Sequence, residues 1–136
     1  PRARIVAMTN MGDCPTLMLN APVPAAKKVL EKAGLTVDDV DLWEINEAFA
    51  VVPMALMAEL SIPHAIVNVN GGACALGHPI GASGARIVGH LARRLRTAGA
   101  GSLGAVGICG GNVIGAYGGN TLNVNVINGE IRVERQ

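Results

Sequence analysis

The sequence predicts an α/β fold: a mixed, mostly parallel sheet with helices on both faces, followed by a C-terminal β-hairpin. Short β-branched and aliphatic runs alternate with longer helical patterns, which is typical of β-α units. The 18 glycines suit a fold with many tight turns better than they suit a helical bundle. Because the chain has one Trp, one Tyr and one Phe, its core must be built from Ala, Val, Ile, Leu and Met.

The first half of the chain predicts strands at 4–8 and 40–45 and helices at 25–33 and 47–60. Pro22 and Pro24 are tolerated in the first turn of a helix, and Gly34 is a typical residue just after the last turn. Asn46 stands in the N-cap position of the second helix. Pro53 is expected in the second turn of that helix, where it would kink it.

The second half predicts a strand at 66–69, a helix at 82–97 and a strand at 102–108. The apolar stripe of this helix consists of Ile87, Val88, Leu91 and Leu95. We expect one domain at 1–111 and a divergent tail at 112–136 that packs on it. In the tail, Asn128-Gly129 between two alternating runs predicts a hairpin. Either residues 113–117 or the first arm of this hairpin could supply the closing strand of the sheet.

Composition excludes several classes of protein. A formal net charge of +1 leaves no electrostatic footprint for nucleic acid, and Arg93, Arg94 and Arg96 are read as cations that complement a helix dipole. No apolar run reaches the roughly 18 residues of a membrane span. Three cysteines without Cys-x-x-Cys spacing fit neither a disulfide framework nor a zinc site. We therefore expect a cytoplasmic protein that binds no nucleic acid, membrane or metal.

The segment 71–86 places a single histidine, His78, in a glycine-lined turn between a predicted strand and a predicted helix. In an open α/β sheet such a turn lies at the carboxyl ends of the strands, where ligands bind. Glycine lets the backbone approach a ligand closely, and Pro79 restricts the backbone of the histidine. The glycine spacing is not a dinucleotide fingerprint and no Gly-Lys-Ser/Thr follows, so phosphate or nucleotide binding is a distant alternative.

Asn46, His78 and Cys109 each lie at the carboxyl end of a predicted strand and are expected to converge on one edge of the sheet. A Cys/His/Asn set suits acyl transfer, since a thiolate can act as nucleophile or base and an imidazole can donate to an oxyanion. Each residue also has a structural interpretation: Asn46 as an N-cap and Cys109 as a small buried hydrophobe.

The remaining histidines and cysteines carry weaker signals. We expect a buried structural role for Cys74, a surface loop position for His64, and a place on the exposed side of the long helix for His90.

Three segments resemble signatures of the thiolases: residues 71–86, Asn46-Glu47-Ala48-Phe49-Ala50, and Cys109-Gly110-Gly111. Their order and spacing agree with the family, and within it they are most similar to acetyl-CoA acetyltransferases. The resemblance implies the C-terminal half of a thiolase. It also implies a reversible Claisen condensation and thiolysis of acyl-CoA, a place in fatty acid metabolism, and coenzyme A thioesters as substrates with no cofactor.

The resemblance also implies residue roles. His78 would assist the nucleophile and hydrogen-bond the thioester oxygen, and Asn46 would orient a water that completes this oxyanion hole. Cys109 would act as acid and base on the acetyl methyl group, and the backbone N–H of Gly111 would serve a second oxyanion hole. Phe49 and Met18 would line the pocket beside the acyl group.

Two departures from the family pattern matter. The acylated cysteine lies in the first half of a thiolase, which this chain does not contain, and neither Cys14 nor Cys74 has its surroundings. The tail after Gly111 also differs. We therefore expect a chain that is inactive alone, needs the missing N-terminal half, and forms homo-oligomers. The alternative is a non-catalytic thiolase-like domain that serves interaction or structure.

Overall fold

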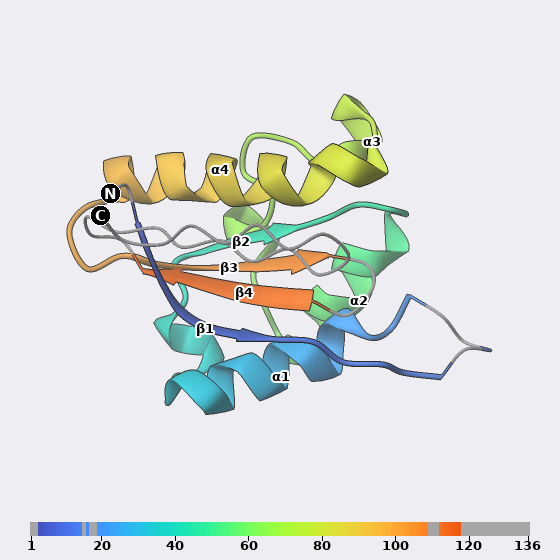
Figure 1. Ribbon diagram of the computed structural model, residues 1–136, viewed down its shortest axis with the longest axis horizontal. Helices are drawn as coiled ribbons and strands as arrows, with labels where there is room; N and C mark the ends of the chain where they lie inside the picture. The colour runs from blue at the N-terminus through green and yellow to red at the C-terminus, as the bar shows by residue number, and fades with distance from the viewer. Residues whose placement is uncertain (1–2, 15, 17–18, 109–111, 118–136) are drawn as a thin grey trace.

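The computed structural model describes residues 3–14, 16, 19–108 and 112–117, in which a four-stranded sheet lies between helices (Figure 1). The described elements, in chain order, are β1 (Arg4–Thr9), α1 (Pro22–Ala33), η1 (Val37–Asp39), β2 (Leu42–Ile45), α2 (Val51–Leu60), η2 (His64–Ile66), α3 (Ala73–Leu76), α4 (Ile80–Ala98), β3 (Leu103–Ile108) and β4 (Asn112–Tyr117).

The order of strands across the sheet is β1-β4-β3-β2. β2 and β3 pair parallel, whereas β4 pairs antiparallel with both β3 and β1. Three strands therefore point one way and β4 points the other, as the predicted mixed α/β sheet requires. Of the two candidates for the closing strand, the segment β4 fills that place. The predicted hairpin at 121–134 lies outside the described residues.

The two faces of the sheet bury different side chains because neighbouring residues of a strand point to opposite faces. Trp43 and Ile45 of β2 belong to a core shared with α1 and α2. Leu42, on the other face, packs against the apolar stripe of α4. Figure 1 shows α4 and α1 on opposite sides of the sheet.

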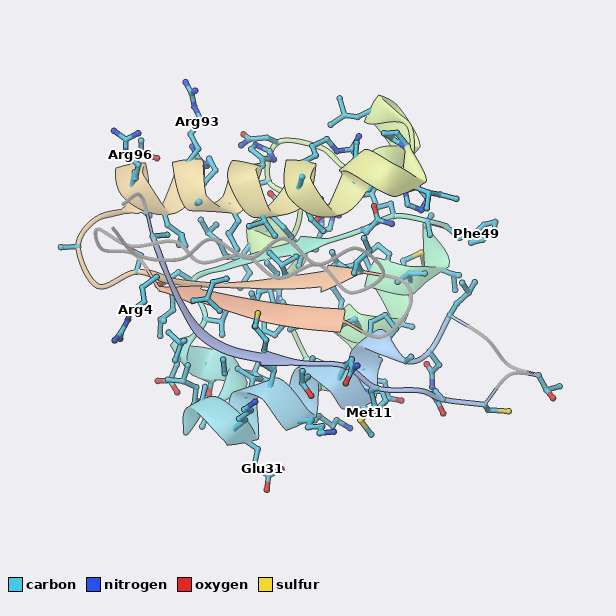
Figure 2. The ribbon with its side chains drawn as sticks, in the orientation of Figure 1. Arg4, Met11, Glu31, Phe49, Arg93 and Arg96 are labelled. Carbon is cyan, nitrogen blue, oxygen red and sulfur yellow. The ribbon has the colours of Figure 1, made fainter. Side chains whose placement is uncertain are left out.

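Gly104 of β3 allows α4 to lie close to the sheet. A Cβ on this residue would come within 2.8 Å of the Leu91 side chain, which is tighter than van der Waals contact permits. The predicted stripe of α4 is confirmed, since Ile87, Val88, Leu91 and Leu95 are all buried. Arg93 and Arg96 project from the same helix away from the sheet (Figure 2).

The predictions for α1, β1 and β3 are confirmed, and α1 ends at Gly34 with a left-handed φ of 68°. The helix predicted at 47–60 begins only at Val51, so the N-cap prediction for Asn46 is wrong. The reason is that the backbone N–H of Asn46 continues the β2–β3 ladder, donating to Gly107 O at 2.8 Å. Pro53 consequently falls in the first turn, where a missing N–H costs no intrahelical hydrogen bond.

The strand predicted at 66–69 is also wrong. The structure has a 3₁₀ turn at η2 and a single bridge between Trp43 and Val67. Asn68 leaves the extended conformation at φ 47° and replaces strand pairing with its side chain. Its Oδ1 accepts from Ile45 N–H at 2.7 Å, and its Nδ2 donates to Ile45 O at 2.8 Å. The side-chain amide of Asn68 therefore makes the two hydrogen bonds to Ile45 that a paired strand would otherwise make.

Candidate active site

Asn46 and His78 meet where β2 ends and α4 is about to begin. The Asn46 Nδ2 lies 3.4 Å from the His78 Nε2. Asn46 is only 1% exposed, whereas His78 is half-buried, so the imidazole can reach a substrate while its partner is fixed in the protein. Two of the three residues expected at this edge of the sheet are thus brought together.

Ser83, in the first turns of α4, holds the other side of the imidazole. Its Oγ lies 2.7 Å from His78 Nδ1 and 3.0 Å from the carbonyl oxygen of Pro79. A carbonyl only accepts, so the single hydroxyl proton is donated to Pro79 and the hydroxyl oxygen accepts from Nδ1–H. Neutral His78 is then protonated on Nδ1, and its Nε2 keeps a lone pair toward Asn46. Sequence reasoning gave Ser83 no role, although it follows the histidine in the same glycine-lined motif.

Asn46 has one further capacity. Within the described residues, its buried Oδ1 has no hydrogen-bond partner. Buried polar side-chain atoms nearly always have a partner, and an exception calls for an explanation. The amide therefore offers an unused acceptor beside the histidine.

Glu47 fastens the glycine-lined turn to the end of β2. Its carboxylate accepts from the backbone N–H of Cys74 at 2.9 Å and from Asn68 Nδ2 at 2.8 Å. Burial works to raise the pKa of Glu47, but these hydrogen bonds outweigh burial and lower it. A Cβ on Gly72 would overlap the carboxylate, so the turn needs glycine there. Sequence reasoning quoted Glu47 within a motif but did not foresee this contact.

The other predicted site residues fall in two groups. Phe49 is 61% exposed and projects into solvent from the loop before α2 (Figure 2). Met18, Cys109 and Gly111 lie outside the described residues, so their roles stay predictions.

The predicted burial of Cys74 is wrong, since both Cys74 and Cys14 are exposed. Desolvation and the neighbouring Glu47 carboxylate raise the pKa of the Cys74 thiol, which makes it a poor source of thiolate. A cavity of about 350 Å³ lies beside Cys74 and Glu47, and its lining does not include Asn46 or His78.

His64 is exposed as predicted, but the exposed position predicted for His90 is wrong. The His90 side chain is 26% exposed, with Nδ1 3.4 Å from Glu44 Oε1 and Nε2 2.7 Å from Asn70 Nδ2. Glu44 is 3% exposed, and its burial, together with the charge of Glu47, raises its pKa to about 7. A titratable pair thus lies beneath α4, apart from His78.

In the described part of the chain, no three His, Cys, Asp or Glu side chains could together hold a metal ion. No helix there has the length and apolarity to cross a bilayer.

A family model described as the thiolase C-terminal domain matches residues 1–119. This chain belongs to the thiolase family. The thiolase domain is 53% identical over 111 residues to acetyl-CoA acetyltransferase B, mitochondrial, of Xenopus laevis, which covers 82% of this chain and 26% of the relative. Its relatives include both mitochondrial and cytosolic acetyl-CoA acetyltransferases.

Solved thiolases share the fold of this domain. The Acat5 thiolase of Ascaris suum, solved in complex with coenzyme A, matches with a TM-score of 0.81 and 41% identity, over 87% of this chain and 31% of its own. The peroxisomal 3-ketoacyl-CoA thiolase of Saccharomyces cerevisiae matches with a TM-score of 0.80 and 37% identity, over 86% and 34%. The yeast protein is described as having two core domains of identical topology. The present chain therefore spans about a third or less of the proteins it matches.

Proposed function

We propose that this thiolase domain supplies the histidine side of an acyl-transfer site for the reversible Claisen condensation of acetyl-CoA, as in acetyl-CoA acetyltransferases. The observation that carries the proposal is the arrangement of Asn46, His78 and Ser83, in which Nε2 of His78 keeps its lone pair beside the Asn46 amide. The acetyl-CoA acetyltransferases among the relatives support the choice of reaction.

In the proposed reaction His78 acts twice. Its Nε2 lone pair accepts the proton of a nucleophilic thiol, whose sulfur then attacks the thioester carbonyl and releases coenzyme A. The Nε2–H formed in this way can donate to the oxyanion that develops on the acyl oxygen. Ser83 holds Nδ1–H throughout, so the same ring nitrogen faces the substrate in both steps.

Cys109, Gly111, Phe49 and Met18 complete the proposal through the family resemblance. The Cys109 thiolate would remove a proton from the methyl group of the second acetyl-CoA, and the resulting carbanion would attack the acyl group and release the nucleophilic thiol. Gly111 would donate a backbone N–H to the second oxyanion, while Phe49 and Met18 would line the acyl pocket. Coenzyme A thioesters are the proposed substrates, with no metal or redox cofactor, and the Ascaris complex with coenzyme A supports this choice.

The nucleophile would come from a second, N-terminal half. Apolar side chains near the site support such a partner, because exposed apolar patches mark interfaces. Five are more than half exposed: Phe49, Val51, Met54, Leu76 and Ile80. The two similar core domains of the yeast thiolase support it as well. The domain alone would then be inactive, and it would pair with that half and with further copies of itself.

A chimera tests the proposal. The present chain replaces the matching segment of the Xenopus relative, and thiolysis of acetoacetyl-CoA is measured for the chimera and for the isolated chain. We expect activity in the chimera only, and His78→Ala should lower it by roughly 100-fold or more. A folded but inactive chimera would instead favour a non-catalytic interaction domain.

We further propose a cytoplasmic location. The cytosolic relatives support it, whereas the mitochondrial relatives give the competing expectation. Fractionation of cells that express the native gene separates the two.

A further inference from the structure

Asn70 and His90 form a second amide–imidazole pair, apart from Asn46 and His78. Asn70, His90 and Glu44 form a chain in which Asn70 Nδ2 is 2.7 Å from His90 Nε2, and His90 Nδ1 is 3.4 Å from Glu44 Oε1. Nothing in the acyl-transfer chemistry uses these three residues. A carboxyl group that is 3% exposed is costly to ionise, so its presence under α4 needs a reason.

The two pairs are joined by the same strand and the same helix. Glu44 and Asn46 are two residues apart on β2, so both point to the face that packs on α4. Ser83 and His90 are seven residues apart on α4, so they lie two turns apart on one face of that helix. Asn46 therefore meets His78 at the start of α4, while Glu44 meets His90 further along the same packing line.

Asn70 links this chain to the turn that carries His78. Two residues earlier, Asn68 fixes the segment to β2 through Ile45 and Glu47. Two residues later, the turn at Gly72 packs against the Glu47 carboxylate. A change in the Asn70–His90 contact therefore acts on a segment that is fastened on both sides to the end of β2.

The hydrogen bonds that join Glu44, His90 and Asn70 can run in either of two directions, and the two arrangements differ by one proton. With Glu44 ionised, His90 Nδ1–H donates to the carboxylate and Nε2 accepts from the Asn70 amide, which matches the observed approach of Nδ2. With Glu44 protonated, its O–H donates to Nδ1, and the ring then presents Nε2–H to Asn70, which must turn its amide to accept.

Burial and the surrounding charges shift the pKa values of Glu44 and His90. Burial raises the pKa of Glu44 to about 7, Glu47 on the same strand end adds to this, and Arg86 and Arg94 of α4 oppose it. Burial lowers the pKa of His90, and Arg94, Arg86 and Arg93 lower it further. Both arrangements are therefore accessible in the neutral range.

We propose that Glu44 is a positioning residue, which through His90 and Asn70 holds the turn that carries His78 against the end of β2. When the group formed by Asn70, His90 and Glu44 gains one proton, the contact between Asn46 and His78 changes. The inference rests on the proposed function only for the role of that contact. The juxtaposition of the two pairs stands without it.

The test is an NMR titration of the full 136-residue chain across the neutral range, which needs neither substrate nor partner half. It follows the ring nitrogens of His90 and His78 and the side-chain amide of Asn46. We expect the ring nitrogens of His90 and the side-chain amide of Asn46 to change with one shared midpoint. In Glu44→Gln that shared step should be lost from both.

The control is Glu31→Gln, which removes an exposed carboxylate from α1 and should leave the shared step unchanged. If Glu44→Gln fails to fold, His90→Gln serves instead, and the step at Asn46 should again be lost. The proposal is overturned if the Asn46 amide does not change together with His90, or if its step survives in the folded variant. An inactive chimera with the shared step intact would remove the proposed reaction and leave this coupling standing.

Discussion

His78 lies just before α4 and His90 lies within it, and the two imidazoles contact opposite kinds of partner. His78 is held by the hydroxyl of Ser83 and the amide of Asn46, which are neutral at every ordinary pH. His90 is held by a buried carboxyl group, with Arg86 and Arg94 one turn away on either side. The first ring is oriented without a fixed charge, whereas the second belongs to a pair that carries one.

The difference teaches that the partner decides what an imidazole can do. Neutral partners at both ring nitrogens fix the tautomer of His78. A buried carboxyl group instead occupies a nitrogen of His90 and makes the pair sensitive to pH. Four predictions test this contrast, in order of expected effect.

Removing each imidazole should have unequal costs. His90→Leu leaves the ionised Glu44 carboxylate buried and unpaired, which should cost about 3 kcal/mol of unfolding free energy at alkaline pH. His78→Leu leaves only neutral partners and should cost about 1 kcal/mol. Urea denaturation of both variants measures the difference. Equal losses would mean that the two rings are held in the same way.

The protonation of Glu44 should appear as a pH dependence of stability. Its pKa is raised from 4.5 to about 7 in the folded domain. The folded state therefore holds the proton more tightly than the unfolded chain. This stabilisation is complete below about pH 4.5 and is lost as the pH rises through about 7.

The loss should amount to about 3 kcal/mol, and Glu44→Gln should abolish it. Thermal melts at several pH values, with Glu31→Gln as the matched carboxylate control, give the comparison. A wild type that loses no more stability than Glu44→Gln over this pH window would contradict the sign.

Ser83→Ala should release the tautomer of His78. Ser83 is fully buried, so alanine leaves Nδ1–H without its acceptor, at a cost of about 1 kcal/mol. Nitrogen chemical shifts of the ring should then report a mixture of Nδ1–H and Nε2–H forms in place of one. Ser102→Ala, a partly exposed serine just before β3, is the control. An unchanged ring spectrum in Ser83→Ala would remove Ser83 from the site.

The smallest effect is expected at an exposed ion pair. Lys27 Nζ and Glu59 Oε2 are 3.9 Å apart, with both side chains more than half exposed. Water and salt screen such a pair, so Glu59→Gln should change stability by less than about 0.5 kcal/mol. This variant sets the baseline against which a buried carboxyl such as Glu44 is judged.

Periodic patterns made most of the sheet and both long helices predictable. The four-residue spacing from Ile87 to Leu91 and Leu95 identified the buried face of α4. The same reasoning failed at His90, because a stripe of apolar residues does not include a histidine. His90 is partly buried beside that stripe because the Glu44 carboxyl group of β2 lies opposite it. The failed strand at 66–69 has a similar cause, since the side chain of Asn68 replaces backbone pairing and leaves no alternation to read. Convergence of Asn46 and His78 was predicted from strand ends, although only Asn46 follows a strand and the segment before His78 is held beside β2 by the side chain of Asn68. Ser83 and Glu47 act through contacts that spacing does not encode.

The Asn68 clamp has a consequence for how the domain survives at high concentration. β2 is an edge strand, and the unpaired N–H and C=O groups of such an edge recruit strands from other molecules. Here the Asn68 backbone N–H donates to Trp43 O at 2.8 Å. Its side-chain amide accepts from Ile45 N–H and donates to Ile45 O. Asn68 therefore occupies backbone groups at this edge that could otherwise pair with a strand of another molecule, at the strand end where Asn46 meets His78.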